Sequence, residues 1–473
     1  MRHFTHFIDG EEFTDSNQKW FTTDAPHTGQ PSAQIALGDA ATIDRAVQSN
    51  MSALNGWRKL DPLTRGQILC ALGRNLRSAI PRLSALEAEE SGKTTKQGPI
   101  EIEQAAQYFE YYGGLTTLPV GEVVDTGPGF HSFSKRVPFG LVGVITPWNL
   151  PLNQSARAIA PALAMGNVVL CKPSEHTSGT AIELARIAIE SGVPKGVLNI
   201  VLGTGPECGE ALVAHDQVRK ICFTGSVRAG REIGRVAADR IIPLTLELGG
   251  KSANIVFADA DLDAAIPVAL AAFATNAGQV CTAGTRLMVQ RDIHDEVVAQ
   301  LVEAAKSAKV GSADDADVGA ITTKDQLSRV HEYFQIAAQD GAKLELGGQP
   351  IAGESAGRYA PITIYSGVKP EMRLAQEEVF GPVLSVMMFD DEAEAIAVAN
   401  GTNYGLAAGL WTRDLSRAHR VADALEAGYI SVNHYSPSIF LPFGGFKQSG
   451  YGREKGIEAL HHYCQVKSIN IKL

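Results

Sequence analysis

Apolar residues recur every three or four positions through much of the first third of this chain, which is the periodicity of amphipathic helices. This pattern predicts helices over residues 41–57, 63–91 and 98–112. Residues 119–137 differ in character, because valine, phenylalanine and threonine are mixed there with Gly127 and Gly129. We expect extended strands around a turn in this segment.

From Gly140 onward, short apolar runs alternate with helical patterns. The runs predict strands over residues 141–146, 167–172, 197–201 and 220–224. Helices are expected over residues 154–165 and 177–191, and from Ser226 onward. Strands that alternate with helices form parallel sheets, and right-handed crossovers place helices on both faces. The pattern therefore predicts an α/β fold with a doubly wound, Rossmann-like domain.

The remainder of the chain carries a second α/β pattern, over about residues 252–435. Residues 466–472 then alternate like an edge strand, which would pair with another element or with another chain. The 473 residues are too many for one compact core, so we expect two to three domains.

Charge and composition exclude several classes of protein. The 52 acidic residues outnumber the 42 basic ones, which gives a net charge of −10. Binding to nucleic acids or to anionic membranes needs a basic surface, so neither partner is expected. The N-terminus has no apolar core and no cleavage pattern, so a secretory signal is not expected. The longest charge-free stretch, residues 264–285, contains Pro267 and Asn276 and is interpreted as a buried helix and loop, not a membrane span.

The six cysteines form no Cys-x-x-Cys pair and have no neighbouring His-x-x-His. Neither a disulfide framework nor a zinc site is supported, and we predict no metal. A reducing cytoplasm fits this cysteine usage best.

One cysteine stands in a distinctive segment. Cys281 lies in the small, glycine-bearing run QVCTAG, in which backbone amides can approach whatever the sulfur attacks. Upstream, Glu247 is a lone carboxylate among apolar neighbours, where burial would raise its pKa toward that of a general base. Together a thiol and an isolated glutamate can perform covalent catalysis followed by water activation. The alternative is that Cys281 is a buried structural cysteine.

Polar residues follow two of the predicted strands, where ligands of an open parallel sheet bind. Lys172 and Glu175 can both reach ribose hydroxyls, or else form a solvated loop pair. After the next strand, Gly225 allows a tight turn and Ser226 can cap a helix whose free amides would face a phosphate. The glycine-rich residues 203–209 are interpreted as a tight turn, with direct contact to a phosphate as the alternative.

Asn149 stands between two prolines, Pro147 and Pro151, that fix its backbone. Its side-chain NH2 could point into a cleft and supply half of an oxyanion hole, with the backbone N–H of Cys281 as the other half. The alternative is a rigid turn in which the asparagine satisfies its own backbone.

Seven segments together resemble the aldehyde dehydrogenase superfamily. Each motif alone is weak, but their order and spacing match across nearly the whole chain. The segments are PWNLP (147–151), KPSE (172–175), FTGS (223–226), ELGGK (247–251), GQVC (278–281), EEVFGP (377–382) and PFGG (442–445).

This resemblance implies a mechanism that fits the residues. The Cys281 thiolate would attack the aldehyde, with Asn149 and the Cys281 amide holding the oxyanion. Hydride would pass to the nicotinamide, and Glu247 would activate the water that hydrolyses the thioester. Glu454 matches a late glutamate of the family and would relay protons, or else be a surface carboxylate.

The resemblance also implies a cofactor site. Glu378 would bind the nicotinamide ribose with Phe380 nearby, and Lys172 and Glu175 would hold the adenosine ribose. A carboxylate beside the 2′-hydroxyl favours NAD over NADP, although a side chain that swings away would permit both. The expected cofactor-binding residues are Thr146, Pro147, Trp148, Lys172, Ser174, Glu175, Gly225, Ser226, Leu248, Glu378 and Phe380.

The family fold implies three parts. Residues 1–118 and 139–248 would form the NAD-binding domain, and residues 249–463 the catalytic domain. Residues 119–138 and 464–473 would form a small β oligomerisation flap, in a homodimer or homotetramer.

Other functions compete with this one. A CoA-acylating relative would usually lack the general base, which Glu247 supplies here. A cofactor-free thiol hydrolase would leave the ribose and phosphate motifs unexplained. A catalytically idle protein on the same fold is disfavoured by the joint presence of Cys281, Glu247 and Asn149.

For the substrate, Arg157 should lie on the helix that lines the pocket, or else pair with a local carboxylate. Succinic semialdehyde dehydrogenases carry a second arginine where this chain has Thr275, so a strong carboxylate clamp is not expected. The sequence around Arg157 resembles bacterial aromatic-aldehyde dehydrogenases. We therefore expect a hydrophobic or aromatic small-molecule aldehyde, with a carboxylate-bearing semialdehyde as the alternative.

Overall fold

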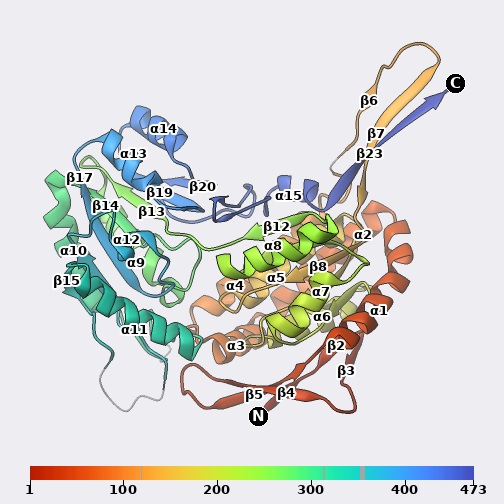
Figure 1. Ribbon diagram of the computed structural model, residues 1–473, viewed down its shortest axis with the longest axis horizontal. Helices are drawn as coiled ribbons and strands as arrows, with labels where there is room; N and C mark the ends of the chain where they lie inside the picture. The colour runs from red at the N-terminus through yellow and green to blue at the C-terminus, as the bar shows by residue number, and fades with distance from the viewer. Residues whose placement is uncertain (119, 313–314, 352–356) are drawn as a thin grey trace.

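Two mainly parallel β-sheets with their helices form the body of this computed structural model, and a narrow β-extension projects from one end (Figure 1). The structure describes residues 1–118, 120–312, 315–351 and 357–473. This is the α/β architecture that the alternating pattern predicted.

The first sheet has the strand order of a doubly wound fold. In the order of hydrogen-bonded neighbours, its strands are β22 (Gly450–Tyr451), β12 (Leu244–Glu247), β11 (Val218–Thr224), β8 (Leu141–Ile145), β9 (Val168–Lys172), β10 (Leu198–Ile200), β2 (His6–Ile8) and β3 (Glu11–Phe13). The strands from β12 to β10 are parallel. Among these parallel strands, β8 comes first in the chain and lies in the middle, so the strand order reverses between β8 and β11, which is where ligands bind in such sheets.

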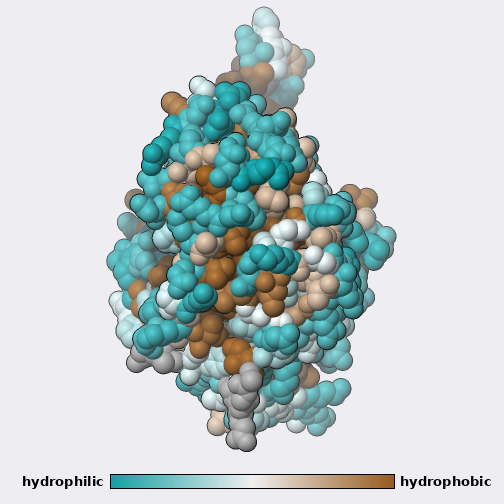
Figure 2. Space-filling model, turned by 90° about the vertical axis from the view of Figure 1, so that its left-hand side faces the viewer, coloured by the Kyte–Doolittle hydropathy of each residue, from teal (hydrophilic) through white to brown (hydrophobic). Residues whose placement is uncertain are grey.

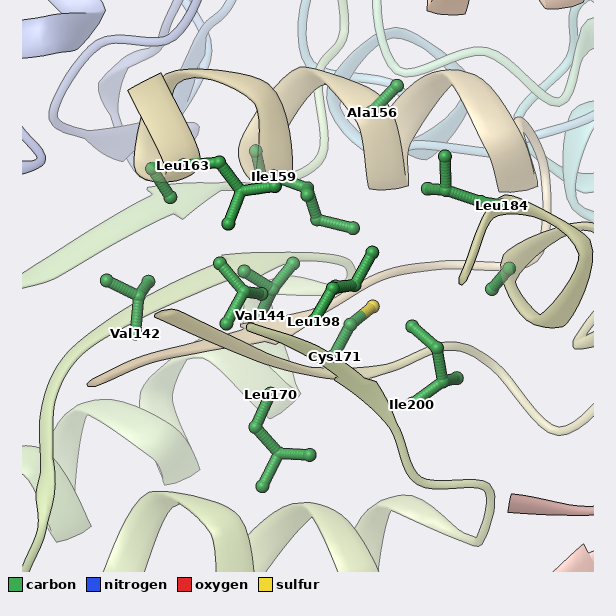
Figure 3. Close-up of a cluster of buried hydrophobic side chains, with 14 of the residues drawn as sticks. Val142, Val144, Ala156, Ile159, Leu163, Leu170, Cys171, Leu184, Leu198 and Ile200 are labelled. Carbon is green, nitrogen blue, oxygen red and sulfur yellow. The ribbon is translucent and has the colours of Figure 1, made fainter. Parts of the chain in front are cut away.

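The helices of this half are mostly amphipathic. They are α1 (Ala40–Lys59), α2 (Pro62–Ser78), α3 (Ile80–Ser91), α4 (Gln97–Gly113), α5 (Pro151–Ala164), α6 (Gly179–Glu190), η1 (Gly205–Gly209), α7 (Glu210–Ala214) and α8 (Val227–Arg240). Helix α5 is buried along its whole length between α4 and the sheet. Figure 3 shows Ala156, Ile159 and Leu163 of α5 above Val142 and Val144 of β8, so this helix is fixed by packing on the strand that precedes it.

The second sheet has a separate hydrophobic core. Its strands, in order, are β15 (Lys343–Leu346), β16 (Thr363–Ser366), β17 (Val383–Phe389), β14 (Arg286–Gln290), β13 (Ala253–Val256), β19 (Ala407–Trp411) and β20 (Tyr429–Val432). All neighbours except β15 and β16 are parallel. The helical segments are α9 (Leu262–Ala274), η2 (Thr275–Gly278), η3 (Arg291–Ile293), α10 (His294–Ser307), α11 (Lys324–Gln339), α12 (Arg373–Gln376), α13 (Glu392–Asn400) and α14 (Leu415–Ala424).

The chain returns to the first sheet near its C-terminus. Tyr451 pairs with Leu246, and Leu460 and Tyr463, in and beside α15 (Glu458–His461), pack in the first core. The predicted catalytic segment 249–463 therefore contributes its last residues to the other half of the molecule. Just before this return, β18 (Tyr404–Gly405) pairs with β21 (Phe446–Lys447).

The extension in Figure 1 is a third sheet, in which β23 (Cys464–Lys472) pairs with β7 (Phe130–Pro138) over nine residues and β7 pairs with β6 (Val123–Val124). The edge strand predicted over residues 466–472 is thus confirmed, and its partner is the predicted hairpin segment. Residue 119 of the predicted flap lies outside the described residues. Val123, Phe130 and Val466 are exposed along this sheet.

Three sequence predictions of local structure were wrong or incomplete. The single helix expected over 63–91 is two helices, because Pro81 lacks an N–H and the chain bends at Ala79. Helix α5 begins earlier than predicted, since Pro151 occupies the first helical position, where its missing N–H costs nothing. The turn at 203–209 closes as the single π-helical turn η1.

The N-terminal strands were not predicted, because they are short and carry polar residues. A small sheet joins β1 (Arg2–Phe4), β5 (Pro31–Leu37) and β4 (Lys19–Asp24). On the face shown in Figure 2, hydrophilic residues predominate, with hydrophobic ones gathered toward the middle. Among the described residues, no helix is both long enough and apolar enough to cross a membrane.

Candidate active site

The carboxyl ends of the parallel strands bring the predicted polar residues to one edge of the first sheet. Ile145 pairs with both Lys172 and Phe223, and Thr224 pairs with Glu247. Because these pairs are level with one another, the segments that follow β8, β9, β11 and β12 all emerge at the same edge. The candidate residues from four separate motifs therefore meet there.

The segment that carries Cys281 leaves α9 through an unusual turn. Asn276, Ala277 and Gly278 all have left-handed backbones, with φ of 53°, 52° and 73°. A side chain at Gly278 would meet the Gly381 carbonyl at 2.2 Å, so only glycine fits. Such strained backbones persist only where surrounding contacts hold them and are concentrated at functional sites.

Gln279 supplies these surrounding contacts. Its buried side chain donates to the Asn276 carbonyl at 2.9 Å and accepts from the Thr322 N–H at 2.9 Å. The backbone before the thiol is therefore fixed from both sides.

Asn149 contacts the same turn. Its Nδ2 donates to the Gln279 carbonyl at 2.8 Å, while Asn276 Nδ2 donates to the Asn149 carbonyl at 3.0 Å. An amide nitrogen carries two hydrogens, so the second remains available for a ligand. The predicted oxyanion donor therefore contacts Gln279, which lies two residues before Cys281 in the chain.

The thiol itself lies against an apolar wall. Cys281 is partly buried and packs against Leu406, Ala407, Tyr429 and Phe443. Burial raises the pKa of the Cys281 thiol to about 11, Arg157 opposes this rise, and Glu247 adds to it. In this state the sulfur is a neutral thiol at pH 7 and needs activation to attack a carbonyl.

This pKa predicts how the thiol reacts with iodoacetamide. Since only the thiolate is a nucleophile, the alkylation rate of Cys281 should rise about tenfold per pH unit between pH 7 and pH 10. Mass spectrometry of the cofactor-free protein can follow this rate, with Cys281→Ala correcting for the partly exposed Cys70. A rate that levels off below pH 9 would contradict the predicted protonation state.

Glu247 is a buried carboxylate at the end of β12. Neither oxygen accepts a hydrogen bond from the described residues. Burial raises its pKa well above the ordinary value, Glu454 raises it further, and Arg157 opposes this. Gly444 allows this placement, because a Cβ there would lie 2.9 Å from Glu247 Oε1. An unpaired buried carboxylate of raised pKa is a candidate general base.

Arg157 and Glu454, predicted as a substrate residue and a proton relay, form a buried ion pair with each other. The side chains are 3% and 2% exposed, so Glu454 is not the surface carboxylate that was considered as an alternative. The Arg157 guanidinium also lies 5.2 Å from the centre of the Phe443 ring. Its charge is therefore neutralised locally, as the alternative for Arg157 anticipated.

Thr275 ends α9 and is exposed, in a surface hollow with Ala271, Ala308 and Asp317. It contributes no charge to the thiol site. Its role as a substrate residue remains a prediction.

The predicted cofactor residues lie around the same edge of the sheet. Lys172 Nζ lies 3.4 Å from Glu175 Oε2, and Ser226 caps α8 by accepting from the Ala229 N–H at 3.2 Å. The Trp148 and Phe380 rings, from segments far apart in sequence, meet edge to face at 5.5 Å.

Glu378 lies against the glycines that follow Glu247. It accepts from the Gly250 N–H at 3.0 Å, and a side chain at Gly249 would come within 2.2 Å of its carboxylate. Burial raises the pKa of Glu378 to about 7. The two glycines of ELGGK therefore allow this acceptor to approach the backbone beside Glu247.

Sequence reasoning missed Gln279, Phe443 and Lys455 as parts of the site. Phe443 and Lys455 come together in the fold, with Lys455 Nζ 4.7 Å from the centre of the Phe443 ring. Burial lowers the pKa of Lys455 to about 7, and its backbone is left-handed, with φ of 58°. Only the position of Gln279 beside the thiol could have indicated its role. Across the described residues, no cluster of histidine, cysteine, aspartate and glutamate could hold a metal ion.

Known proteins resemble the chain along nearly its full length. A model described as the aldehyde dehydrogenase family matches residues 13–469. Betaine aldehyde dehydrogenase of Bacillus subtilis (strain 168) is 40% identical over 98% of this chain and 96% of that protein. The indole-3-acetaldehyde dehydrogenase AldA of P. syringae, solved as a mutant with NAD+ and IAA, has a TM-score of 0.97 and 41% identity over 99% of this chain and 96% of its own. An NAD-dependent aldehyde dehydrogenase of Sinorhizobium meliloti has a TM-score of 0.97 and 34% identity over 100% of this chain and 95% of its own.

Proposed function

Because the chain belongs to the aldehyde dehydrogenase family, we propose that it oxidises an aldehyde to the carboxylic acid with NAD, through a covalent intermediate on Cys281. The observation that carries this proposal is the buried Glu247 near the Cys281 thiol, whose oxygens accept no hydrogen bond from the described residues. The two groups are close enough for Glu247 to raise the pKa of the thiol. A nucleophile and a separate base are what formation and hydrolysis of a thioester require.

In the first half of the reaction, the Cys281 thiol gives its proton to solvent water, and its sulfur bonds to the aldehyde carbon. The carbonyl oxygen becomes an oxyanion, which the second hydrogen of the Asn149 amide stabilises. NAD, when bound, would supply the acceptor for the hydride that leaves this carbon. The substrate carbon then remains attached to Cys281 as a thioester.

In the second half, Glu247 removes a proton from water and the oxygen attacks the thioester carbon. The carbon–sulfur bond breaks, the acid leaves, and Cys281 is restored. The Arg157–Glu454 pair contacts neither reacting atom in this scheme, and its charges set the electrostatic surroundings of Glu247. The carboxylate at position 247 also favours water over coenzyme A as the nucleophile that cleaves the thioester.

The residues present fit NAD. The relative from P. syringae was solved with NAD+. Glu378 has a second carboxylate oxygen free to accept from a ribose hydroxyl, because only Oε1 bonds to Gly250. Lys172 and Glu175 would hold the adenosine ribose, and the Glu175 charge would repel a 2′-phosphate and so favour NAD over NADP.

We assign the substrate as a hydrophobic or aromatic aldehyde. Phe443 and Tyr429 form part of the apolar wall beside the thiol. Glu454 neutralises the charge of Arg157. Betaine aldehyde carries a quaternary ammonium group, which a charged Lys455 beside the Phe443 ring would repel. A carboxylate-bearing aldehyde is the second candidate, and one observation favours it. Among the described residues, Lys455 makes no ion pair, and its ammonium group lies over the Phe443 ring, where it could pair with a substrate carboxylate.

The assignment is tested by kcat/KM for benzaldehyde, medium-chain aliphatic aldehydes, succinic semialdehyde and betaine aldehyde, followed through the absorbance of reduced nicotinamide. We expect benzaldehyde to exceed both charged substrates by about tenfold or more, the range that pocket complementarity supplies. A preference for succinic semialdehyde that Lys455→Met removes would establish the second candidate instead. No signal with any aldehyde would refute the proposed function.

The third sheet is proposed as the surface through which the chain forms a homodimer or homotetramer. Its support is the row of exposed apolar residues on a sheet that projects from the body. All six cysteines are free, which supports the cytoplasm as the proposed compartment.

A further inference from the structure

A buried charge triad lies at the end of α3, outside the groups that the reaction uses. Lys93 Nζ lies 3.1 Å from Glu87 Oε2 and 2.9 Å from Glu101 Oε2. The Lys93 and Glu87 side chains have no exposed surface at all. Burying such charges costs free energy unless they are paired and hydrogen-bonded. The buried Glu87 carboxylate should therefore have hydrogen-bond partners besides Lys93.

The other oxygen of Glu87 supports the Asn149 segment. Glu87 Oε1 accepts from the Leu152 N–H at 3.0 Å, in the first turn of α5. This helix has no side-chain cap of its own, so the remote carboxylate satisfies one of its free amides. Asn149 lies immediately before this turn, and a shift of α5 would carry its amide away from the thiol.

The residues that follow Glu87 support the Cys281 segment. Thr322 Oγ1 donates to the Ser91 carbonyl at 2.7 Å, and the Ala320 N–H donates to the Gly92 carbonyl at 2.8 Å. Thr322 N–H in turn donates to Gln279 Oε1 at 2.9 Å. A side chain at Gly92 would come within 2.9 Å of Ala320, so the approach is close.

We propose that Glu87, together with the carbonyls of Ser91 and Gly92, forms a clamp that fixes the Asn149 amide relative to Cys281, with Glu87 and Thr322 as positioning residues for the first chemical step. At the end of α3, Glu87 contacts the helix that follows Asn149. The Ser91 carbonyl contacts Thr322, which in turn contacts Gln279 beside Cys281. These two sets of contacts meet where the Asn149 side chain donates to the Gln279 carbonyl. This inference rests on the proposed function, because it assigns a role in thioester formation.

Glu90 provides a matched control on the same helix. It is also buried, and it accepts from the Gly179 N–H at 2.9 Å, at the start of α6. Glu87 and Glu90 thus each cap a helix of the first half of the molecule. Only the helix capped by Glu87 carries the Asn149 segment.

The experiment measures the rate of the first turnover of reduced cofactor, the affinity for NAD and the melting temperature. Glu87→Ala should slow the first turnover about tenfold or more, because small misplacements of reacting groups cost rates of this order. Glu87→Gln keeps an acceptor for Leu152 N–H and should recover most of the rate. Glu90→Ala should lower the melting temperature similarly and leave the first turnover within about twofold of wild type, as expected of a cap alone.

A second variant tests the clamp independently in case the Glu87→Ala protein does not fold. Thr322→Val removes the hydroxyl donor with little change of shape and should slow the first turnover several-fold with unchanged NAD affinity. The clamp is overturned if Glu87→Ala and Thr322→Val keep the wild-type rate, or if Glu90→Ala slows it as much. A wild-type protein that reduces no NAD with any aldehyde would refute the proposed function instead.

Discussion

Replacing Cys281 with alanine is expected to abolish aldehyde oxidation, with kcat/KM falling about 10⁴-fold or more, because no other group can form the covalent intermediate. The thiol is the one cysteine that packs against the apolar wall of the pocket. The other five cysteines lie elsewhere in the fold, and four of them are buried. The measurement is the steady-state absorbance of reduced nicotinamide with excess aldehyde and NAD.

The control for this variant is NAD binding, since removal of the sulfur should leave the ribose contacts intact. Protein fluorescence titrated with NAD should give a dissociation constant within about twofold of wild type. Cys70→Ala, at the other partly exposed cysteine, should retain full activity. Substantial turnover by the Cys281 variant would show that the reaction does not pass through this thiol.

Replacing Glu247 with glutamine is expected to separate the two halves of the reaction. Thioester formation and hydride transfer should proceed, whereas hydrolysis should slow about 10²- to 10⁴-fold, the usual contribution of a general base. Rapid mixing with aldehyde and NAD should then give a burst of one reduced cofactor per active site, followed by a slow steady state. Glutamine preserves the shape beside Gly444, so the pocket should be retained.

The size of the burst decides what Glu247 does. If the burst disappears along with turnover, Glu247 acts earlier, for example by taking the proton from the Cys281 thiol. The high pKa of that thiol makes this a real alternative. Addition of coenzyme A provides a second check, because a competing nucleophile that restores turnover would show that the thioester had accumulated.

The sequence predicted the parts of the fold that depend on local pattern. The strands around β8 have continuous apolar runs, and Ser226 stands at the start of a helix, as its side chain favours. The N-terminal strands have only a few residues each and gain their stability from pairing with distant segments, so no local pattern reveals them. The break at Ala79 follows from Pro81 and could have been predicted.

The candidate site was predictable in its members but not in its contacts. The motifs identified Cys281, Glu247 and Asn149, each by residue type and neighbours. The pairing of Arg157 with Glu454 joins residues almost 300 positions apart, and the bond from Asn149 to the Gln279 carbonyl joins the two halves of the molecule. Such contacts are set by tertiary packing, which the periodicity of one segment does not encode.

The unpaired burial of Glu247 also bears on how robust the folded protein is. A carboxyl whose pKa is raised by folding binds its proton more tightly in the native state than in the unfolded chain. Its favourable contribution to stability is therefore present at low pH and is lost as the pH rises from the unfolded pKa through the native one. At neutral pH the group that would activate water opposes folding, and the surrounding core must compensate for it. The carboxylate therefore lowers stability at neutral pH at the position where the proposed reaction needs a base.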